Sequence, residues 1–186
     1  MKKTLKIVVL VIAIGIIGYG IKYLNDTTFS GNDRIKIIEN YESISSLNDI
    51  INNPDFKNKV LYVDLWGVYC TPCIAEFEYM PALKEKYKNE DVAFIYLSAP
   101  YNRFDDTQKW KSGIKKYNLE GYNALMSMDF YNEIWKEVPK MKNPFSIPHY
   151  LIIDKNGKII NPNAPRPSGK ETLYVELDKL LEQTEA

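Results

Sequence analysis

The strongest constraint on the fold is a strand, a turn and a helix that carry the two cysteines of the chain. An apolar run from Val60 to Trp66 has the length and composition of a buried β-strand, and Gly67 lets the chain turn out of it. Cys70 and Cys73 follow, and the residues from Pro72 to about Lys88 can continue as a helix. A C-x-x-C between a strand and a helix is the setting in which this motif is redox-active.

The chemistry of a helix N-terminus supports this interpretation. Cys70 would meet free backbone N–H groups and the positive end of the helix dipole, which stabilise a thiolate. Cys73, one turn further on, is placed to attack a mixed disulfide formed by Cys70. A structural zinc site would need four ligands, but the chain has two Cys and one His. A purely structural disulfide would close a loop too short to stabilise the fold by much.

The segment V-D-L-W-G-V-Y-C-T-P-C-I-A-E-F, from Val63 to Phe77, resembles the active site of the thioredoxin superfamily. Within that superfamily it is most similar to the membrane-anchored TlpA/ResA-like thiol-disulfide oxidoreductases. The resemblance covers the chain from about Leu47 to its end and implies a thioredoxin-like α/β fold, with a central mixed β-sheet flanked by helices. Tyr69 stands where this family usually has Trp, and we expect it to keep the aromatic shielding role.

Residues 1–25 form a candidate membrane anchor. Lys2, Lys3 and Lys6 precede an uncharged stretch from Ile7 to Ile21. Counted to Leu24, a helix here would be ~27 Å long, against a hydrocarbon core of ~30 Å. No small-residue cleavage pattern follows, so an uncleaved anchor is favoured over a removed signal peptide. The excess of lysines before the span predicts a cytoplasmic N-terminus and an extracytoplasmic remainder.

The rest of the chain reads as a tether (residues 26–45) and one thioredoxin-like domain (46–186), whose least typical part is 122–146. The 186 residues carry 24 basic and 24 acidic side chains, so nothing points to nucleic acid. We expect the protein to be a monomer. The patterns predict these further elements: a short strand near Arg34–Ile38, helices at Ser46–Ile51, Asp105–Tyr117 and Phe130–Met141, strands at Val92–Ser98 and Ala124–Asp129, a hairpin around Asn156-Gly157, and a last helix from Ser168 or Gly169 to Leu181. Pro81 should kink the helix after the cysteines, and Trp110 lies on an apolar helical stripe that indicates core.

The resemblance implies a substrate surface around the cysteines. In thioredoxin-like proteins an Ile-Pro dipeptide with a cis bond opens the strand after the central region, and Ile147-Pro148 matches it. The backbone before that proline can pair with an incoming peptide as an added strand. We therefore expect Ile147 and Pro148, together with Trp66 and Tyr69, to bind substrate.

Two acids are candidates for proton transfer to and from Cys73. Asp64 matches the buried acid that thioredoxin-like proteins carry beneath the second cysteine, and burial should raise its pKa. Glu76, three residues after Cys73, lies on the same helical face and matches an acid of the ResA-like members. The ordinary alternatives are a strand-edge acid facing water for Asp64 and an exposed first-turn acid for Glu76.

His149 follows Pro148, and its side chain can point toward the redox site or to the opposite face of the strand. The ordinary interpretation is a surface histidine at a strand end. The sharper one is a third ligand beside Cys70 and Cys73 for a thiophilic ion such as Cu(I). Thioredoxin-fold copper chaperones use a wider cysteine spacing, which weakens that alternative.

The predicted function is an extracytoplasmic thiol-disulfide oxidoreductase that needs no cofactor or metal beyond the Cys70–Cys73 pair. The C-x-P-C centre, with no Lys, Arg or His inside it, resembles the reducing members of the superfamily more than the oxidising ones. The expected partners are a disulfide-containing exported protein, such as apocytochrome c, and a membrane or extracytoplasmic thiol donor. The alternatives are a Cu(I)-binding module and a disulfide oxidant or isomerase of the same fold. A peroxidase is disfavoured because no reactive Cys follows a Thr-x-x pattern on a helix of its own.

Overall fold

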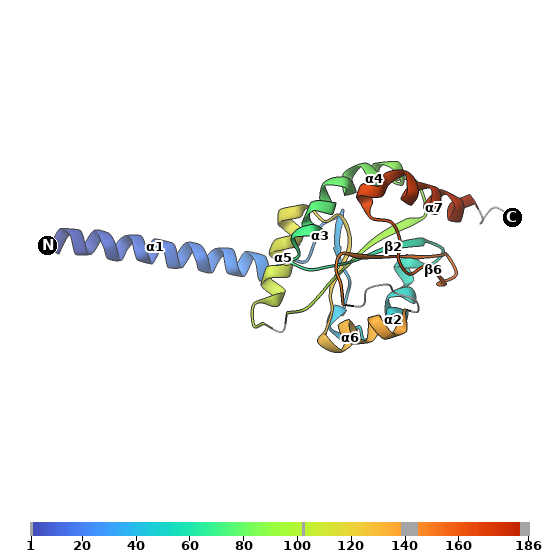
Figure 1. Ribbon diagram of the computed structural model, residues 1–186. Coiled ribbons are helices and arrows are strands. Elements are labelled where there is room, and N and C mark those ends of the chain that lie inside the picture. The colour runs from blue at the N-terminus through green and yellow to red at the C-terminus, as the bar shows by residue number, and fades with distance from the viewer. Residues whose placement is uncertain (1, 102, 139–144, 183–186) are drawn as a thin grey trace.

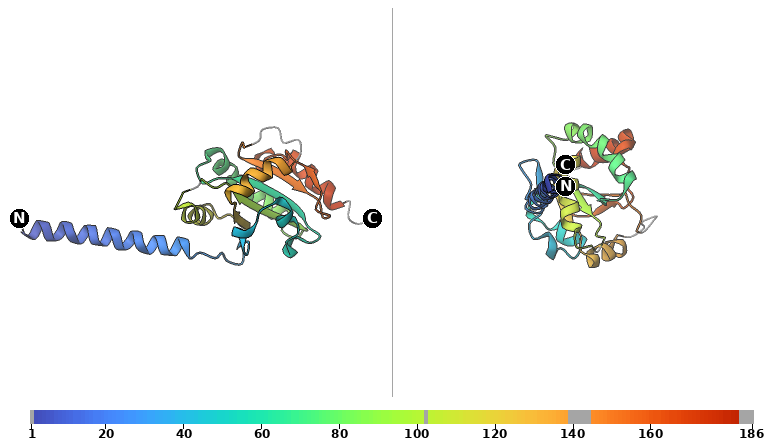
Figure 2. Two further views of the ribbon diagram at one scale, coloured as in Figure 1. Left: turned by 90° about the horizontal axis from the view of Figure 1, so that it is seen from below. Right: turned by 90° about the vertical axis from the view of Figure 1, so that its left-hand side faces the viewer.

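The computed structural model describes residues 2–101, 103–138 and 145–182, and consists of a long N-terminal helix and an α/β domain (Figure 1). The long helix, α1 (Lys2–Thr27), projects away from the domain in both side views (Figures 1 and 2). It contains an apolar stretch, Thr4–Asn25, that is long enough to cross a membrane. The side chains of this stretch face solvent rather than protein, which suggests membrane anchoring.

A six-stranded mixed sheet forms the centre of the domain, in the order β1-β4-β3-β2-β5-β6. The first four strands of this order are parallel, whereas β5 runs antiparallel to β2 and β6 antiparallel to β5. The strands are β1 (Ile35–Ile37), β2 (Val60–Trp66), β3 (Val92–Ser98), β4 (Gly121–Leu125), β5 (His149–Ile153) and β6 (Ile159–Asn161). The thioredoxin-like α/β fold predicted from the sequence is confirmed.

Helices cover both faces of this sheet. In Figure 1, α3, α4 and α7 lie on one side of the sheet and α2 and α6 on the other. The helices of the domain are α2 (Leu47–Ile51), α3 (Thr71–Glu76), α4 (Met80–Lys86), α5 (Asp106–Tyr117), α6 (Met128–Glu137) and α7 (Lys170–Glu182), and short 3₁₀ turns span Tyr41–Ser43, Pro54–Phe56, Phe77–Tyr79 and Pro167–Gly169.

The central strand β2 is buried along its whole length and divides the core into two layers. Because side chains alternate along a strand, Tyr62, Asp64 and Trp66 face the layer under α3, α4 and α7. Leu61, Val63 and Leu65 face the layer under α2 and α6. Asp64 is therefore the one charged side chain that β2 turns into its core, on the cysteine-bearing side.

Local chemistry explains where several elements begin and end. The Ser46 hydroxyl accepts a hydrogen bond from the Asp49 N–H, and the Asp49 carboxylate accepts from the Ser46 N–H, so α2 starts with a capping box. Asn118 ends α5 in the left-handed conformation, with φ of 49°. In the β5–β6 hairpin, Gly157 adopts a φ of 79°, as the predicted Asn-Gly turn requires.

Two sequence predictions need correction. The strand expected at Ala124–Asp129 lies earlier, at Gly121–Leu125, because Ser127 caps α6 by accepting a hydrogen bond from the Phe130 N–H. The helix expected at Phe130–Met141 accordingly begins at Met128 and ends at Glu137; its predicted final residues lie outside the described residues.

The helix expected at Pro72 to Lys88 is divided by a 3₁₀ turn into α3 and α4. Pro81 stands in the first turn of α4, where a proline needs no N–H partner. The predicted kink is thus present as a break in the helix. Trp110 is fully buried, which confirms that it belongs to the core.

Candidate active site

The two cysteines form a disulfide at the start of α3. Cys70 is the N-cap residue of this helix, and its sulfur accepts a hydrogen bond of 3.2 Å from the Cys73 N–H. The chain reaches this position through a tight turn, in which the Cys70 N–H donates to the Gly67 carbonyl. An N–H directed at the Cys70 sulfur favours the thiolate over the thiol when the pair is reduced.

The two sulfurs differ in access to solvent. Cys70 is 8% exposed, whereas Cys73 is 0% exposed. A substrate sulfur can therefore reach only Cys70 without rearrangement of the site. This difference assigns Cys70 as the sulfur that exchanges with a partner and Cys73 as the one that reacts inside the protein.

Ile147 and Pro148 lie at the turn that presents Cys70. Their peptide bond is cis, as predicted. A Cβ added at Gly67 would lie 3.0 Å from Ile147 Cδ1 and would collide with the Tyr101 hydroxyl. Ile147 and Tyr101 thus close on the backbone three residues before Cys70, and only glycine leaves them that space.

Tyr69 forms an exposed rim beside Cys70. Its ring is 48% exposed and packs edge-on against Tyr101, with 4.8 Å between the ring centroids. The Arg103 guanidinium lies 5.2 Å from the Tyr69 ring centroid and donates a hydrogen bond of 3.3 Å to its hydroxyl. Tyr69 is therefore available for substrate contact, next to a positive charge.

Trp66 does not reach this rim, and the expectation that it binds substrate is wrong. Its indole is 0% exposed and packs edge-on against Phe77, with 5.3 Å between ring centroids. Its Cη2 atom also lies 3.3 Å from the position of a Cβ on Gly113. Trp66 points into the core because it shares the inward face of β2 with Tyr62 and Asp64.

Asp64 is a buried carboxyl without a counter-charge in direct contact. It is 1% exposed, and neither of its oxygens has a hydrogen-bond partner within the described part of the chain. Burial raises the pKa of Asp64 well above its ordinary value, the negative charge of Glu76 adds to the rise, and the positive charge of Lys84 opposes it. The predicted rise in pKa is confirmed, and a strand-edge acid facing water is excluded.

The sequence did not reveal the tyrosines that surround this carboxyl. The register of the sheet places Tyr96 on β3 and Tyr150 on β5 directly beside Asp64. The Tyr150 ring stacks on Tyr62 at 5.4 Å between centroids, and the Tyr62 hydroxyl donates a hydrogen bond of 2.7 Å to the Pro165 carbonyl. A signal was present, because β2 and β3 have seven residues each and an in-step pairing matches Asp64 with Tyr96.

Lys84 is a second residue of this buried cluster that sequence patterns did not indicate. Its ammonium lies 5.1 Å from the centroid of the Tyr96 ring. Burial lowers the pKa of Lys84 to about 8, and the negative charges of Glu120 and Asp64 limit that fall. The ammonium of Lys84, the carboxyl of Asp64 with its raised pKa, and the tyrosine rings thus lie in the same layer of the core as Cys73.

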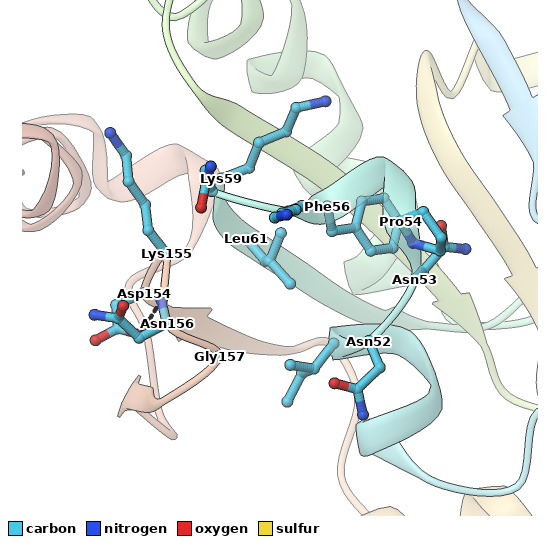
Figure 3. A pocket seen from close by; sticks show the side chains of 13 residues that line it. Asn52, Asn53, Pro54, Phe56, Lys59, Leu61, Asp154, Lys155, Asn156 and Gly157 are labelled. Carbon is cyan, nitrogen blue, oxygen red and sulfur yellow. Dashed lines mark hydrogen bonds between the residues drawn. The ribbon is translucent and has the colours of Figure 1, made fainter.

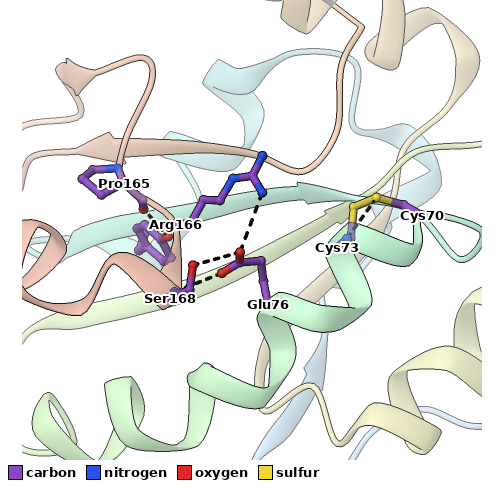
Figure 4. A network of polar contacts seen from close by, with 7 residues as sticks. Cys70, Cys73, Glu76, Pro165, Arg166 and Ser168 are labelled. Atoms are coloured by element: carbon purple, nitrogen blue, oxygen red, sulfur yellow. Dashed lines mark hydrogen bonds and ion pairs between the residues drawn. A yellow bond between two sulfur atoms is a disulfide. The ribbon is translucent and has the colours of Figure 1, made fainter.

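Glu76 is also buried, at 7% exposure, and its carboxylate is fully engaged (Figure 4). It accepts hydrogen bonds from the Ser168 N–H at 2.9 Å and from the Ser168 hydroxyl at 3.0 Å. Arg166 Nη1 lies 3.8 Å from its Oε1. Figure 4 shows the Glu76 side chain directed at Ser168 and Arg166 rather than at the disulfide. An exposed first-turn acid is excluded.

His149 lies on the opposite face of the sheet from the redox pair. It pairs with Leu65, which faces the layer under α2 and α6. Its Nε2 is 2.7 Å from the Pro162 carbonyl oxygen, its ring lies 5.5 Å from Trp135, and burial lowers its pKa. His149 is therefore not placed to be a third ligand beside Cys70 and Cys73, which contradicts the basis of the Cu(I) alternative.

A separate hollow lies at the other end of β2. A pocket of about 400 Å³ is lined by the segment that enters β2 and by the β5–β6 turn (Figure 3). Asp154, the acid of this pocket, already accepts hydrogen bonds from the N–H groups of Asn156 and Lys158. This carboxylate stabilises the hairpin turn, and the pocket is separate from the redox site.

Comparison with known proteins agrees with this site. The model of the Redoxin family matches residues 41–174. The thiol-disulfide oxidoreductase ResA of Bacillus cereus (strain ATCC 10987) is 29% identical over 159 residues, which are 83% of either chain. ResA of Bacillus thuringiensis subsp. konkukian is 34% identical over 107 residues, 57% of this chain and 55% of that protein.

Solved structures give the same result. A crystal structure of a Bacteroides vulgatus protein, assigned as a thiol-disulfide oxidoreductase, is 32% identical with a TM-score of 0.56, covering 68% of this chain and 82% of that one. A structure from Chlorobium tepidum, assigned as thiol:disulfide interchange protein DsbE, has a TM-score of 0.55 at 23% identity, covers 68% of this chain and 83% of that one, and shows likeness of fold. The family match spans both cysteines and the segments that surround them.

Proposed function

Because the chain belongs to the Redoxin family, in which it is a ResA-like thiol-disulfide oxidoreductase, we propose that it reduces disulfides in exported proteins at the outer face of the cytoplasmic membrane. The observation that carries this proposal is the disulfide between Cys70 and Cys73, with one reachable sulfur and buried acids behind the other. Cys70 and Cys73 are the catalytic residues in the proposed reaction.

The reaction transfers two electrons from the reduced Cys70–Cys73 pair to the substrate disulfide. The Cys70 thiolate attacks one substrate sulfur, so that a mixed disulfide forms and the other substrate sulfur leaves as a thiolate. Cys73 then loses its proton and attacks the Cys70 sulfur. The second substrate sulfur leaves as a thiolate, both substrate thiolates take up protons, and the disulfide seen in the structure remains.

Asp64 and Glu76 are proposed to serve the second step. Asp64 faces the same layer as Cys73, and its raised pKa makes its ionised form a stronger base than an ordinary carboxylate, so that form can take the Cys73 proton. Glu76 lies one helical turn from Cys73 and is held by Ser168, so its negative charge has a fixed position. Together they would assist the attack of Cys73 on the mixed disulfide.

The substrate is proposed to bind across Ile147, Pro148 and Tyr69. Ile147 packs against the Gly67 turn, and Tyr69 is exposed beside Cys70. An extended peptide can pair with the backbone before Pro148 while its cysteine meets Cys70. Apocytochrome c is one exported dithiol protein that this reaction would serve.

The reducing direction of the reaction is inferred from the C-x-P-C motif, and the extracytoplasmic location of the domain is inferred from α1. The C-x-P-C centre holds no basic residue that would favour the reduced form strongly enough to make an oxidant. The apolar helix α1 would anchor the domain, and the lysines that precede its apolar stretch would keep its N-terminus in the cytoplasm. Since the outer compartment is oxidising, a membrane or extracytoplasmic thiol donor must reduce the pair again.

Trapping tests the proposal. Cys73→Ser should accumulate mixed disulfides between Cys70 and exported proteins, visible on non-reducing gels and lost on reduction. The matched control, Cys70→Ser, keeps one cysteine but loses the reachable sulfur, and should trap far less. If Cys73→Ser yields no more adduct than Cys70→Ser, the proposed mechanism is wrong.

A further inference from the structure

The end of the domain next to α1 carries an exposed aromatic side chain and a basic helix face. Phe104, in the loop that leads into α5, is 99% exposed. Lys109 and Lys116 are exposed on α5, and their spacing of seven residues places them on one face of that helix. We refer to Arg103, Phe104, Lys109 and Lys116 as the basic face.

The position of α1 relates this face to the membrane. α1 contacts α5, and Phe29, two residues beyond α1, packs against the domain core. The Lys115 ammonium lies 5.7 Å from the centroid of the Phe29 ring. Figures 1 and 2 both show α1 leaving the domain alongside α5, at the end where the loop into α5 lies. When α1 spans a bilayer, α5 and this loop come to the headgroup region.

The charge of this segment suits anionic lipid. Residues 103–117 contain five basic and two acidic side chains, a net charge of +3, in a chain whose formal net charge is zero. The two acids are engaged: Asp106 accepts hydrogen bonds from the N–H groups of Tyr101 and Arg103, and Asp105 lies 4.0 Å from the Lys109 ammonium. Attraction between basic groups and anionic headgroups acts over about a Debye length, ~10 Å.

An exposed phenylalanine alone would be ordinary. Here it directly follows Arg103 in the loop that leads into α5, the helix that contacts an apolar helix of membrane-spanning length. Aromatic side chains combined with Lys and Arg are the composition of segments that lie in the membrane interface. The composition and the place of the segment therefore point to the same surface.

We infer that the basic face docks on anionic lipid headgroups, with Phe104 inserted among them, and holds the rim of the redox disulfide at the membrane surface. This inference rests on the proposed role of α1 as an anchor. Tyr69 joins the docked loop to the disulfide, because its ring packs on Tyr101 and under Arg103. The docked orientation favours a thiol donor whose reactive sulfurs lie at the membrane surface.

Quenching of tryptophan fluorescence by brominated lipid tests the inference in the full chain. The native indoles of Trp66, Trp110 and Trp135 are buried and give a common background. Three single variants are reconstituted in phosphatidylglycerol nanodiscs: Tyr19→Trp in the apolar part of α1, Phe104→Trp, and Val175→Trp on α7. Val175 is the matched control because it is a well-exposed apolar side chain, at 68% exposure, on a helix apart from α1.

The inference predicts that Tyr19→Trp and Phe104→Trp lose emission to a similar extent and that Val175→Trp keeps its emission. Adding Lys109→Gln and Lys116→Gln to Phe104→Trp should restore much of the emission, and so should replacing phosphatidylglycerol by phosphatidylcholine. If Tyr19→Trp is quenched while Phe104→Trp matches Val175→Trp, the docking is refuted and the anchor stands. If Tyr19→Trp is not quenched, the anchor fails and the docking with it, while disulfide reductase activity in detergent remains a separate test of the chemistry.

Discussion

Replacing Asp64 by Asn should stabilise the oxidised protein at neutral pH and not at acidic pH. The carboxyl is buried among tyrosines, and burial raises its pKa well above the ordinary value. In the unfolded chain the same group ionises near its reference pKa of about 3.9. Between these two pKa values the folded state holds a proton that the unfolded state has released. The stability that this carboxyl contributes is therefore fully present below its pKa in the unfolded chain. It is lost as the pH rises toward its pKa in the folded protein.

The size of the effect follows from the number of protons. One proton difference changes the free energy of unfolding by about 1.4 kcal/mol per pH unit. While the carboxyl of the folded protein stays protonated, raising the pH from 4 to 6 therefore lowers the free energy of unfolding by up to about 2.7 kcal/mol. An amide is of similar size and does not ionise, so Asp64→Asn removes this penalty. The oxygen and nitrogen of the introduced amide find no more hydrogen-bond partners than the carboxyl oxygens do, so the gain in the free energy of unfolding at pH 4 should be close to zero.

Urea unfolding of the full chain in mild detergent, followed by circular dichroism at several pH values, measures this difference. Asp129→Asn is the matched control, because Asp129 is an exposed acid at the start of α6. The stability gained by Asp64→Asn should increase with pH, while Asp129→Asn should show no such slope. A gain that is independent of pH, or a loss of stability that grows with pH, would refute the account of Asp64 as a carboxyl that burial keeps protonated.

Three further substitutions test neighbouring parts of the structure. Glu76→Ala should destabilise the oxidised protein by roughly 1.5–3 kcal/mol, because it removes the charged acceptor of two Ser168 hydrogen bonds; Glu76→Gln should cost less, and equal losses in urea unfolding would contradict this. Gly67→Ala should cost roughly 1–3 kcal/mol and lower kcat/KM for disulfide reduction, because a Cβ there collides with the Tyr101 hydroxyl; unchanged kinetics would show that the rim is not part of the site. Asp49→Asn should lower stability at neutral pH but not near pH 2, because hydrogen bonds, first that from the Ser45 N–H, lower the pKa of Asp49; a loss that persists in acid would argue for packing rather than charge.

The main elements of the fold were predictable because their signals are local. Val60–Trp66 and Val92–Ser98 are apolar runs of strand length, and both strands have those bounds in the structure. The Asn156-Gly157 turn likewise fixes its hairpin within a few residues. The strand at Gly121–Leu125 was placed too late because it contains Asn123, a polar residue that patterns assign to loops. In the folded chain the Asn123 amide is buried and donates to the carbonyls of Leu119 and Gly121.

The site was predictable in its cysteines and only partly in its surroundings. Cys70 and Cys73 stand in a motif, whereas the partners of Glu76 come from a loop 92 residues away in the sequence. No local pattern predicts that Ser168 will contact Glu76, because the contact depends on how the 3₁₀ turns at Phe77–Tyr79 and Pro167–Gly169 pack against each other. The face of the sheet to which the His149 side chain points depends on the register between β2 and β5. In that register His149 pairs with Leu65, and its side chain points away from the cysteines. The partners of Glu76 and the orientation of His149 were therefore set by long-range packing and strand register, which local sequence patterns do not contain.

The reduction potential of the Cys70–Cys73 pair tests the central claim most directly. Equilibration of the protein in redox buffers of graded potential gives the fraction of disulfide at each potential. Reductive work on exported proteins predicts a value near that of thioredoxin, about −270 mV. A value near that of DsbA, about −120 mV, would contradict the proposed direction and make the protein an oxidant of exported thiols.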